Sequence, residues 1–318
     1  MKDLKIAVIN GGNSAEAEVS RSSAKGVIKA LEANFSNVLS VELERSIATT
    51  LNAFDPDVVF PILHGPPGED GTLQGFLEIM GYRYVGSNVH SSALAMDKIA
   101  AKQVFRDNKL PVADQCVVYS NTPVAENLDY ITARLGESVV VKPASQGSAI
   151  GVTLIEEVDE LSSALVNASA YDPRLLVEKR IYGREITVGV LDTAEGSEAF
   201  PVIEIKTPSG SWYDFDHRYT EGWSHHIMPA ELTPEITREL QRIAVSAHQS
   251  LGCRDLSRAD FVVSDDEIVL LEVNTLPGMT PTSLYPDGAK GFGLEFSALC
   301  EHLVGRAANR ELQRQTFN

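Results

Sequence analysis

The sequence is poor in cysteine, in basic relative to acidic residues, and in long apolar runs. Its cysteines, Cys116, Cys253 and Cys300, are widely spaced and include no CxxC pair, which argues against both a disulfide framework and a zinc site. There are 27 Lys and Arg residues against 44 Asp and Glu, and the net charge of −17 argues against a general nucleic-acid or anionic-membrane surface. A phosphate ligand would therefore need a few placed cations and Mg²⁺.

Targeting signals and two common nucleotide-binding patterns are also missing. No apolar run approaches the length of a membrane span, and the chain enters a strand-like segment at residues 5–9 without an apolar region of signal-peptide length. We therefore expect a cytoplasmic protein that binds neither membrane nor nucleic acid. The patterns GxxxxGK[ST] and GxGxxG are absent, which argues against a P-loop NTPase and a Rossmann dehydrogenase.

The first part of the chain predicts a small parallel α/β domain over residues 1–95. Of the 318 residues, 43% are hydrophobic and 22% charged, as in soluble proteins of two or three domains. A strand at 5–9 precedes a helix from about residue 18, and a strand at 57–63 precedes a helix near residue 72. Ligands bind beyond the carboxyl ends of such strands, and both Glu16 and His64 fall there.

The pattern changes near residue 96, and the rest predicts α+β domains over residues 96–180 and 181–318. The expected helices cover residues 97–108 and 234–251, and the expected strands cover 139–142, 151–155, 175–178, 185–191 and 201–206. An irregular stretch at 207–229 contains five aromatic residues and is long for a plain connection. We expect it to be an active-site lid.

A hairpin near the C-terminal end predicts a magnesium site. A turn at residues 265–266 folds the run beginning at Asp260 onto a second run, so that Asp260 lies near Glu272. The two-residue repeat of a strand places Glu272 and Asn274 on one face, with Val273 pointing away. Two carboxylates and a carboxamide suit Mg²⁺ rather than Zn²⁺. The structural alternative is a surface hairpin with solvated acids.

Two lysines are candidate phosphate ligands. Lys142 ends a predicted strand, and the following residues 143–151 are rich in glycine and hydroxyl groups, which can offer backbone N–H groups to phosphate oxygens. The same segment could be a plain hairpin. Lys98, taken alone, is an ordinary solvated helix lysine.

The order of these motifs resembles that of ATP-grasp enzymes and, more narrowly, of the D-alanine:D-alanine ligase family. The resemblance covers essentially the whole chain. It rests on GGNSAEAEVS (11–20), LHG (63–65), GEDGTLQG (68–75), MDK (96–98), GS (147–148), RAD (258–260) and EVNTLPGMT (272–280). It implies a three-domain ATP-grasp architecture with a parallel α/β N-terminal domain. Such enzymes activate a carboxylate as an acyl phosphate.

The resemblance also implies the ligands and their residues. ATP is expected to contact Lys98, Lys142, Glu178, Lys179, Glu185 and Arg218, and two Mg²⁺ ions, with Mn²⁺ as a substitute, are expected on Asp260, Glu272 and Asn274. The first D-alanine is expected at Glu16 and His64, and the second at Ser283 and Leu284. Glu16, Ser148 and Tyr219 would help remove a proton from the attacking amine, while Arg258 and Gly278 would stabilise the oxyanion. The family also implies a homodimer.

Several of these residues have structural alternatives. Glu16 could favour a helix N-terminus through the helix dipole, Tyr219 could pack in the lid, and His64 could be an ordinary turn histidine. Arg218 stands where the family often has Lys before the Tyr, and a guanidinium is not interchangeable with an ammonium. The neighbouring His225 and His226 have no third ligand at suitable spacing.

The expected function is ATP-dependent formation of D-alanyl-D-alanine for peptidoglycan precursors. One alternative is a related ligase whose second substrate is D-serine, D-lactate or another amino acid; the hydroxyl of Tyr219 argues against lactate. A second alternative, from another class, is a nucleotide-binding regulatory protein that no longer ligates. The oxyanion residues and the proton-removing group argue against a plain binding protein.

Overall fold

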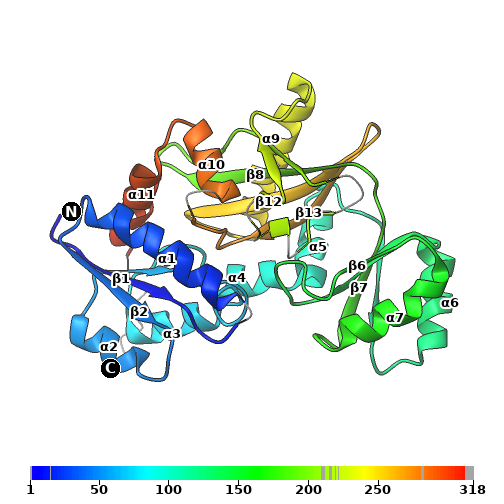
Figure 1. The fold of residues 1–318 in the computed structure, drawn as a ribbon, viewed down its shortest axis with the longest axis horizontal. Coiled ribbons are helices and arrows are strands. Elements are labelled where there is room, and N and C mark those ends of the chain that lie inside the picture. Colours follow the sequence, from blue (N-terminus) through cyan, green and yellow to red (C-terminus); the bar gives the residue numbers. More distant parts are fainter. Residues whose placement is uncertain are drawn as a thin grey trace.

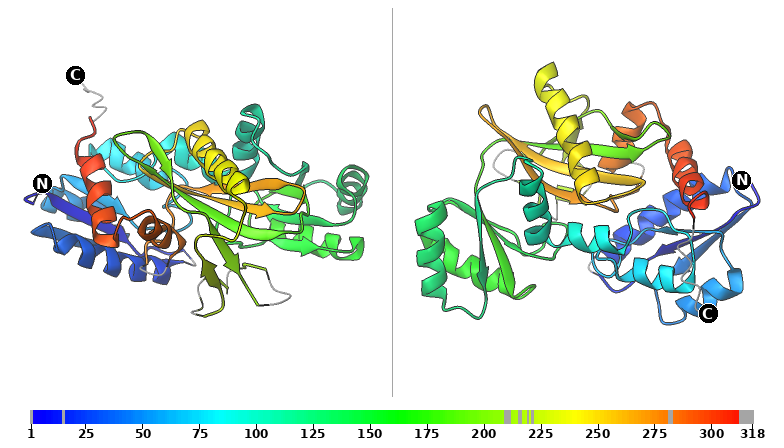
Figure 2. Two further views of the ribbon diagram at one scale, coloured as in Figure 1. Left: turned by 90° about the horizontal axis from the view of Figure 1, so that it is seen from above. Right: turned by 180° about the vertical axis from the view of Figure 1, so that it is seen from behind.

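The computed structural model describes residues 2–14, 16–208, 212–214, 217–218, 220, 222–280 and 283–311. Three sheets organise the chain, and in Figure 1 they lie side by side, with the N-terminal sheet at the left and the largest sheet in the middle. Two further views show the same arrangement from above and from behind (Figure 2). Among the described helices, none is both long and apolar enough to cross a membrane.

The N-terminal sheet is parallel, as the sequence predicts, with the order β2-β1-β3. The elements of this part are β1 (Lys5–Asn10), α1 (Ala17–Glu32), β2 (Asn37–Glu42), α2 (Ile47–Phe54), β3 (Val58–Pro61) and α3 (Thr72–Met80). Alternate residues of β1 point to opposite faces. Ile6 and Val8 pack in the cluster that contains α1, whereas Ala7 and Ile9 pack with α2 and α3. Helices therefore bury both faces of this sheet.

The last helix of the chain, α11 (Phe296–Ala308), returns to this N-terminal sheet. It packs against α1 and β3, and its Leu303 and Val304 are fully buried in the same cluster as Ile6. In Figure 1 α11 lies close to the labelled N-terminus. The final helix thus covers one face of a sheet whose strands lie between Lys5 and Pro61, at the other end of the chain.

The second sheet is antiparallel, with the order β4-β7-β5-β6. Its region comprises α4 (Val89–Met96), α5 (Lys98–Asp107), β4 (Gln115–Tyr119), α6 (Val124–Leu135), β5 (Val139–Pro143), β6 (Thr153–Ile155), α7 (Val158–Ser169) and β7 (Arg174–Lys179). One face packs on α6 and α7 through residues such as Val139, Val141 and Val177. Because side chains alternate along a strand, Lys142 and Glu178 emerge on the opposite face.

The third sheet has the order β11-β10-β8-β12-β13, with β9 paired to β8. Its elements, with the flanking helices, are β8 (Arg184–Asp192), β9 (Ser197–Ala199), β10 (Ile203–Lys206), β11 (His225–Ile227), α9 (Pro234–Ser250), β12 (Leu256–Val263), β13 (Ile268–Asn274) and α10 (Leu284–Gly291). Ile186, Val188 and Val190 of β8 pack in the core with α9. Glu185 and Thr187, which alternate with these residues along β8, therefore face the other side of the sheet.

A β-bulge on β13 decides which face Glu272 occupies. Asp260 of β12 pairs with Glu272, but the next residue, Phe261, pairs with Leu270, so the register shifts by one residue. The shift lets Leu270 and Val273 both enter the core, although they are three positions apart. Glu272 is consequently on the opposite face from Leu270.

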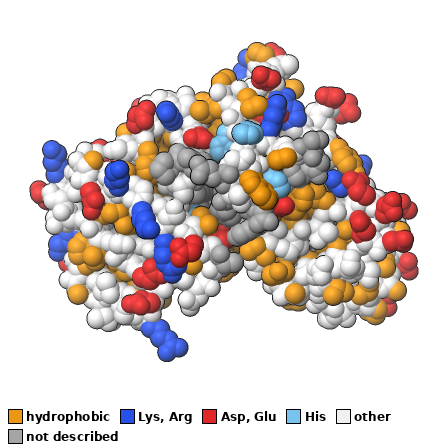
Figure 3. All heavy atoms as spheres, viewed as in Figure 1, with side chains coloured by type: hydrophobic (Ala, Val, Ile, Leu, Met, Phe, Trp, Pro, Cys, Tyr) orange, Lys and Arg blue, Asp and Glu red, His pale blue; other side chains and the backbone are white. Residues whose placement is uncertain are grey.

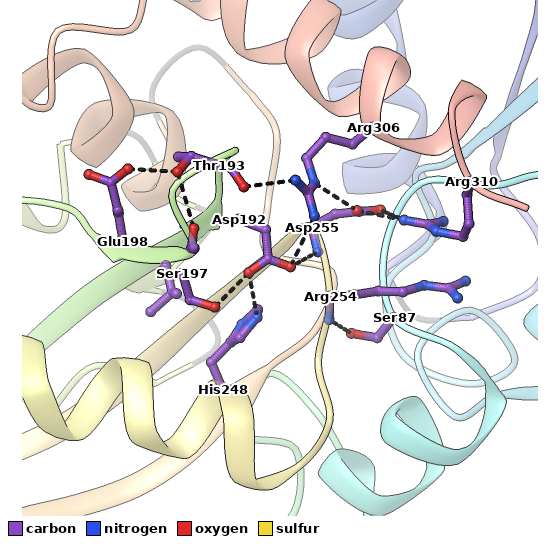
Figure 4. Close-up of polar contacts among 12 residues, drawn as sticks. Ser87, Asp192, Thr193, Ser197, Glu198, His248, Arg254, Asp255, Arg306 and Arg310 are labelled. Carbon is purple, nitrogen blue, oxygen red and sulfur yellow. Dashed lines mark hydrogen bonds and ion pairs between the residues drawn. The ribbon is translucent and has the colours of Figure 1, made fainter.

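A buried ionic network fixes the third sheet to the N-terminal sheet and to α11 (Figure 4). Asp255, which is fully buried, accepts from the Gly86 backbone N–H at 2.8 Å and from Arg310 Nη2 at 2.6 Å. Arg306 lies 3.5 Å from Asp255 and 3.8 Å from Asp192. Asp255 stands immediately before β12, so the network sets the position of the strand that carries Arg258 and Asp260.

Candidate active site

Two adjoining cavities, of about 900 and about 430 Å³, lie where the three sheets meet. Lys98, Gln146, Tyr213, Arg218 and Glu272 line both of them. The two cavities therefore share a boundary that carries two cationic side chains and one carboxylate.

The predicted site residues divide between the cavities according to their expected roles. The large cavity is lined by Glu16, His64, Ser148, Arg258, Asn274, Gly278, Ser283 and Leu284. The small cavity is lined by Lys142, Glu178, Lys179 and Glu185. Asp260 is 8% exposed and lines neither cavity, and Tyr219 lies outside the described residues. The residues expected to bind amino acid are thus separated from those expected to bind the base and ribose.

Glu16 and His64 follow the carboxyl ends of β1 and β3, where the sequence places them. The Ser148 hydroxyl donates a hydrogen bond to Glu16 Oε1 and so joins the second sheet's loop to the N-terminal domain. His64 is 7% exposed, and its Nε2 atom has no hydrogen-bond partner among the described residues. Burial lowers the pKa of His64 more than the charge of Glu16 raises it. A neutral imidazole with a free ring nitrogen therefore faces the cavity.

The loop that carries Ser148 has an unusual backbone. Ser148 and Ala149 have φ angles of 47° and 60°, in the left-handed region that non-glycine residues seldom adopt. This conformation costs free energy and tends to be retained where the surrounding structure or the function requires it. Here it brings the Ser148 hydroxyl to Glu16.

Arg258 and Asp260 form a bidentate ion pair on the cavity side of β12. Arg258 Nε donates to Asp260 Oδ1 at 2.8 Å, and Nη2 donates to Oδ2 at 2.6 Å. Thr187 Oγ1 also donates to Asp260 Oδ1 at 2.6 Å. Burial would lower the pKa of Arg258, but Asp260 raises it well above the ordinary value. The guanidinium is therefore permanently charged.

The three predicted metal ligands occupy adjacent positions of the β12–β13 ladder. Asp260 pairs directly with Glu272, and Arg258 pairs with Asn274. Burial would raise the pKa of Glu272, but Lys98, Arg218 and Lys142 lower it to about 2. Two carboxyl groups and one side-chain amide oxygen form an all-oxygen donor set, which fits Mg²⁺.

Lysine–carboxylate pairs run from the cavity boundary into the small cavity. Lys98 Nζ donates to the Gln146 carbonyl at 2.6 Å and lies 3.2 Å from Glu272 Oε2. Lys142 Nζ lies 2.6 Å from Glu178 Oε2. The Lys98 and Lys142 side chains are only 11% and 13% exposed. Lysines held this way, with part of their surface open to a cavity, can bind phosphate oxygens.

Among the described residues on the face shown in Figure 3, no comparable concentration of positive charge is present. On the face shown in Figure 3, Lys and Arg side chains are scattered, and acidic side chains gather along the margin of the right-hand lobe. Positive charge for a phosphate ligand is therefore placed within the cavities, as the acidic composition predicts.

The small cavity lies between two sheets. Val140 and Leu154 of the second sheet line one side, and Ile205, Val262 and Leu271 of the third sheet line the other. Such a slot between apolar side chains suits a flat aromatic base.

Glu185 and the described part of the 207–229 segment border this slot. The Tyr213 backbone N–H donates to Glu185 Oε1 at 3.1 Å, and the Arg218 guanidinium lies 4.5 Å from the centre of the Tyr213 ring. Tyr213 is 6% exposed. The segment therefore packs over the boundary between the cavities.

The N-terminus of α10 faces the large cavity. Ser283 is its N-cap residue, and Leu284 is its first helical residue. A Cβ atom added to Gly278 would lie 3.0 Å from Ser283 Oγ, so glycine keeps this backbone open. Free N–H groups at a helix N-terminus can bind a carboxylate.

Sequence reasoning missed Lys102 and gave no role to Glu69. Lys102 is 1% exposed and lies 2.5 Å from Glu178 Oε1; its spacing of four residues from Lys98 on one helix face was an available signal. Glu69 belongs to the GEDGTLQG motif but was not predicted to be a site residue. In the structure it lines the large cavity. Charge spacing could have identified Lys102, whereas the burial of Glu69 depends on tertiary packing.

Comparison with known proteins gives one consistent family. The model described as D-ala D-ala ligase C-terminus matches residues 104–305, and the model of the N-terminus matches residues 42–87. The chain is 44% identical to the D-alanine–D-alanine ligase of Halalkalibacterium halodurans, over 95% of this chain and 98% of that protein.

Solved structures agree. The D-alanine–D-alanine ligase of Bacillus anthracis complexed with ATP is 31% identical, has a TM-score of 0.81, and is matched over 96% of this chain and 97% of that one. The VanG D-Ala:D-Ser ligase of Enterococcus faecalis is 32% identical with a TM-score of 0.81, over 96% and 99% of the two chains. These matches confirm the predicted architecture.

Proposed function

Because the chain belongs to the D-ala D-ala ligase family, we propose that it is an ATP-dependent ligase that joins two D-alanine molecules to D-alanyl-D-alanine for peptidoglycan precursors. The observation that carries the proposal is the boundary shared by the two cavities. Lys98, Arg218 and Glu272 line both, so a phosphoryl group bound there is within reach of both an adenine slot and an amino-acid pocket.

Nucleotide binding is assigned to the small cavity and its boundary. The adenine lies between the two sheets near Glu178 and the Lys179 backbone, and the ribose lies near Glu185. Lys98, Lys142 and Arg218 bind the phosphate oxygens and neutralise charge that develops during phosphoryl transfer. An Arg at position 218 can meet the γ-phosphate with two donors.

Asp260, Glu272 and Asn274 hold two Mg²⁺ ions, for which Mn²⁺ can substitute. Their oxygen donor set and the ionised state of Glu272 support this assignment. When bound, the ions neutralise phosphate charge and orient the γ-phosphoryl group toward the first substrate. Asp260 must then share its oxygens with Arg258 and Thr187, which already donate to it.

Amide-bond formation is assigned to the large cavity. Glu16 binds the ammonium of the first D-alanine, and His64 lies against that substrate. The carboxylate of this D-alanine attacks the γ-phosphorus, ADP leaves, and an acyl phosphate is formed. Arg258 and the Gly278 backbone N–H then stabilise the oxyanion formed by amine attack, which collapses to the amide as phosphate leaves.

The second D-alanine binds through its carboxylate at the N-terminus of α10, with Ser283 and the Leu284 N–H as donors. Its ammonium must lose a proton before the amine can attack. The contact of Ser148 with Glu16 supports a proton route through this pair. Tyr219, by family resemblance, is the third member of that group.

The proposal also covers the second substrate, the cellular location and the oligomeric state. The relative at 44% identity is named for D-alanine alone, whereas the D-Ala:D-Ser ligase is 32% identical, so D-alanine is favoured for the second site. We place the enzyme in the cytoplasm as a homodimer.

A product assay tests this function. The protein is incubated with Mg·ATP and D-alanine, and dipeptide, ADP and phosphate are quantified. We expect equal amounts of dipeptide, ADP and phosphate. When D-serine or D-lactate is added as a competing second substrate, we expect little of the mixed product. Phosphate release without dipeptide, or no dependence on D-alanine, would refute the proposal.

A further inference from the structure

The turn after β3 brings a second carboxyl group into the amino-acid pocket beside Glu16. Glu69 is 7% exposed and Glu16 is 3% exposed, and both line the large cavity. Glu69 Oε2 accepts the Gly65 backbone N–H at 2.6 Å, which fixes the side chain across its own turn. Nothing in the reaction described above uses this buried acid.

The side chains of Glu69 and Glu16 both approach Gly147. A Cβ atom built on Gly147 would lie 3.7 Å from Glu69 Oε2 and 3.9 Å from Glu16 Oε2. Both oxygens therefore face the same glycine of the Ser148 loop. A small cation next to that glycine could reach both carboxyl groups.

The charges around Glu69 favour a bound cation. Burial, followed by the nearby charge of Glu16, raises the pKa of Glu69 to about 8, although the Gly65 N–H and Arg258 oppose the shift and Glu272 adds to it. His64, in the same turn, has a lowered pKa and is neutral. Without a ligand, Glu69 is thus largely protonated near neutral pH, and a cation that entered would favour its ionised form.

We propose that Glu69 is a second binding residue for the ammonium group of the first amino acid, which it holds together with Glu16. The inference deepens the proposed function and rests on it. Two carboxylates around one ammonium would select an α-amino acid over a hydroxy acid or a simple carboxylic acid at the first site, because those molecules bring no positive charge to the two carboxyl groups.

Glu69→Gln separates this role from support of the turn. The Gln side-chain oxygen can still accept the Gly65 N–H, so the turn is kept, but the amide cannot ionise to pair with a bound cation. Asp70→Asn is the matched control: Asp70 Oδ1 accepts the Thr72 N–H at 2.9 Å, and Asp70 lines neither cavity. The two variants make the same replacement of a carboxyl group by an amide at adjacent positions.

The assay isolates the first site. Hydroxylamine traps the acyl phosphate formed from D-alanine and Mg·ATP, and the hydroxamate is measured as D-alanine or ATP is varied. We expect Glu69→Gln to raise the D-alanine concentration for half-maximal rate by about tenfold or more, with the ATP dependence unchanged and Asp70→Asn within about twofold of wild type.

The pH dependence of D-alanine affinity distinguishes a binding role of Glu69 from a purely structural one, because a structural role would leave it unchanged. In the wild type, affinity for the first D-alanine should increase from about pH 6.5 to about pH 8 as Glu69 ionises more readily, and Glu69→Gln should lose this increase. An unchanged D-alanine dependence, or the same pH profile in Glu69→Gln and wild type, would overturn the proposal. A wild-type protein that forms neither hydroxamate nor dipeptide would instead refute the proposed function.

Discussion

Arg258 and Asp260 lie two positions apart on β12, and both guanidinium nitrogens that face the carboxylate, Nε and Nη2, donate to it, at 2.8 and 2.6 Å. One strand thus holds the residue proposed to stabilise the oxyanion and a residue proposed to bind Mg²⁺. Because Asp260 is directly opposite Glu272, the acyl-transfer and phosphoryl-transfer groups share a rigid two-stranded support.

Arg258→Lys should lower kcat by about 10²–10³ while ATP binding changes little, because an ammonium cannot reproduce the fixed pair of donors at the oxyanion. Steady-state kinetics and nucleotide titration measure the two effects separately. Loss of thermal stability and ATP affinity together with activity would instead indicate a structural arginine.

Glu272→Gln and Asn274→Ala should each abolish ligation and leave the fold intact, since each removes a metal ligand at a cavity wall without opening a hole in the core. Activity is measured over a Mg²⁺ series, and circular dichroism checks the fold. Near-normal turnover of both variants at saturating Mg²⁺ would contradict the metal assignment.

The sequence alone could predict the hairpin chemistry but not its full geometry. Alternation correctly places Glu272 and Asn274 opposite Val273, which lies in the core. The bulge that also turns Leu270 inward is a tertiary adjustment, without a local sequence signal. The strand also begins earlier than predicted, at Leu256 rather than Asp260, because its first residues pair with β8.

The segment at residues 207–229 shows a second limit of prediction from sequence. Length and aromatic content indicated that residues 207–229 cover the site, and the burial of Tyr213 against Glu185 agrees with this. The predicted role of Tyr219 falls outside the described residues and stays a prediction. Short elements such as β9 and β11 were also missed, because three-residue strands form only where a neighbouring strand supplies hydrogen bonds.

Lys102→Met should destabilise the protein by about 3 kcal/mol, near the lower end for a broken buried pair, since Lys142 still neutralises Glu178. The Lys102 and Glu178 side chains are 1% and 3% exposed. Lys206→Met is the control, because Lys206 is 51% exposed and 4.0 Å from Glu204, and it should cost under about 1 kcal/mol. Chemical denaturation measures both; equal losses would refute the importance of the buried pair.

Asp255→Asn should cost about 3–5 kcal/mol of unfolding free energy, because it leaves Arg310 without its buried counter-charge and leaves Arg306 with Asp192 alone. Asparagine tolerates the left-handed backbone at this position, where φ is 66°, so the loss reports charge rather than strain. Glu239→Gln removes one partner of the exposed pair with Arg242 and should change stability by less than about 1 kcal/mol. A loss of similar size in both variants would contradict a stabilising role for the network.

The same network should weaken in acid. Burial would raise the pKa of Asp192, but the contact with His248, whose Nε2 lies 3.3 Å from Oδ1, and hydrogen bonds from Ser197 and the Asp255 N–H lower it well below its usual value. A lowered folded pKa contributes stability above the unfolded value, about 4, and this contribution declines as pH falls below that value. Wild-type stability measured from about pH 6 to pH 3 should decrease more steeply than that of Asp192→Asn, and parallel curves would contradict this assignment.

Transfer of a carboxylate oxygen to phosphate is the direct test of the proposed acyl phosphate, which forms between ATP and the first D-alanine at the boundary shared by the two cavities. D-alanine labelled with ¹⁸O in its carboxylate is converted with Mg·ATP, and the phosphate is analysed by mass spectrometry. We expect one labelled oxygen in each phosphate released with dipeptide. Dipeptide formation with unlabelled phosphate, or with label in AMP, would contradict it.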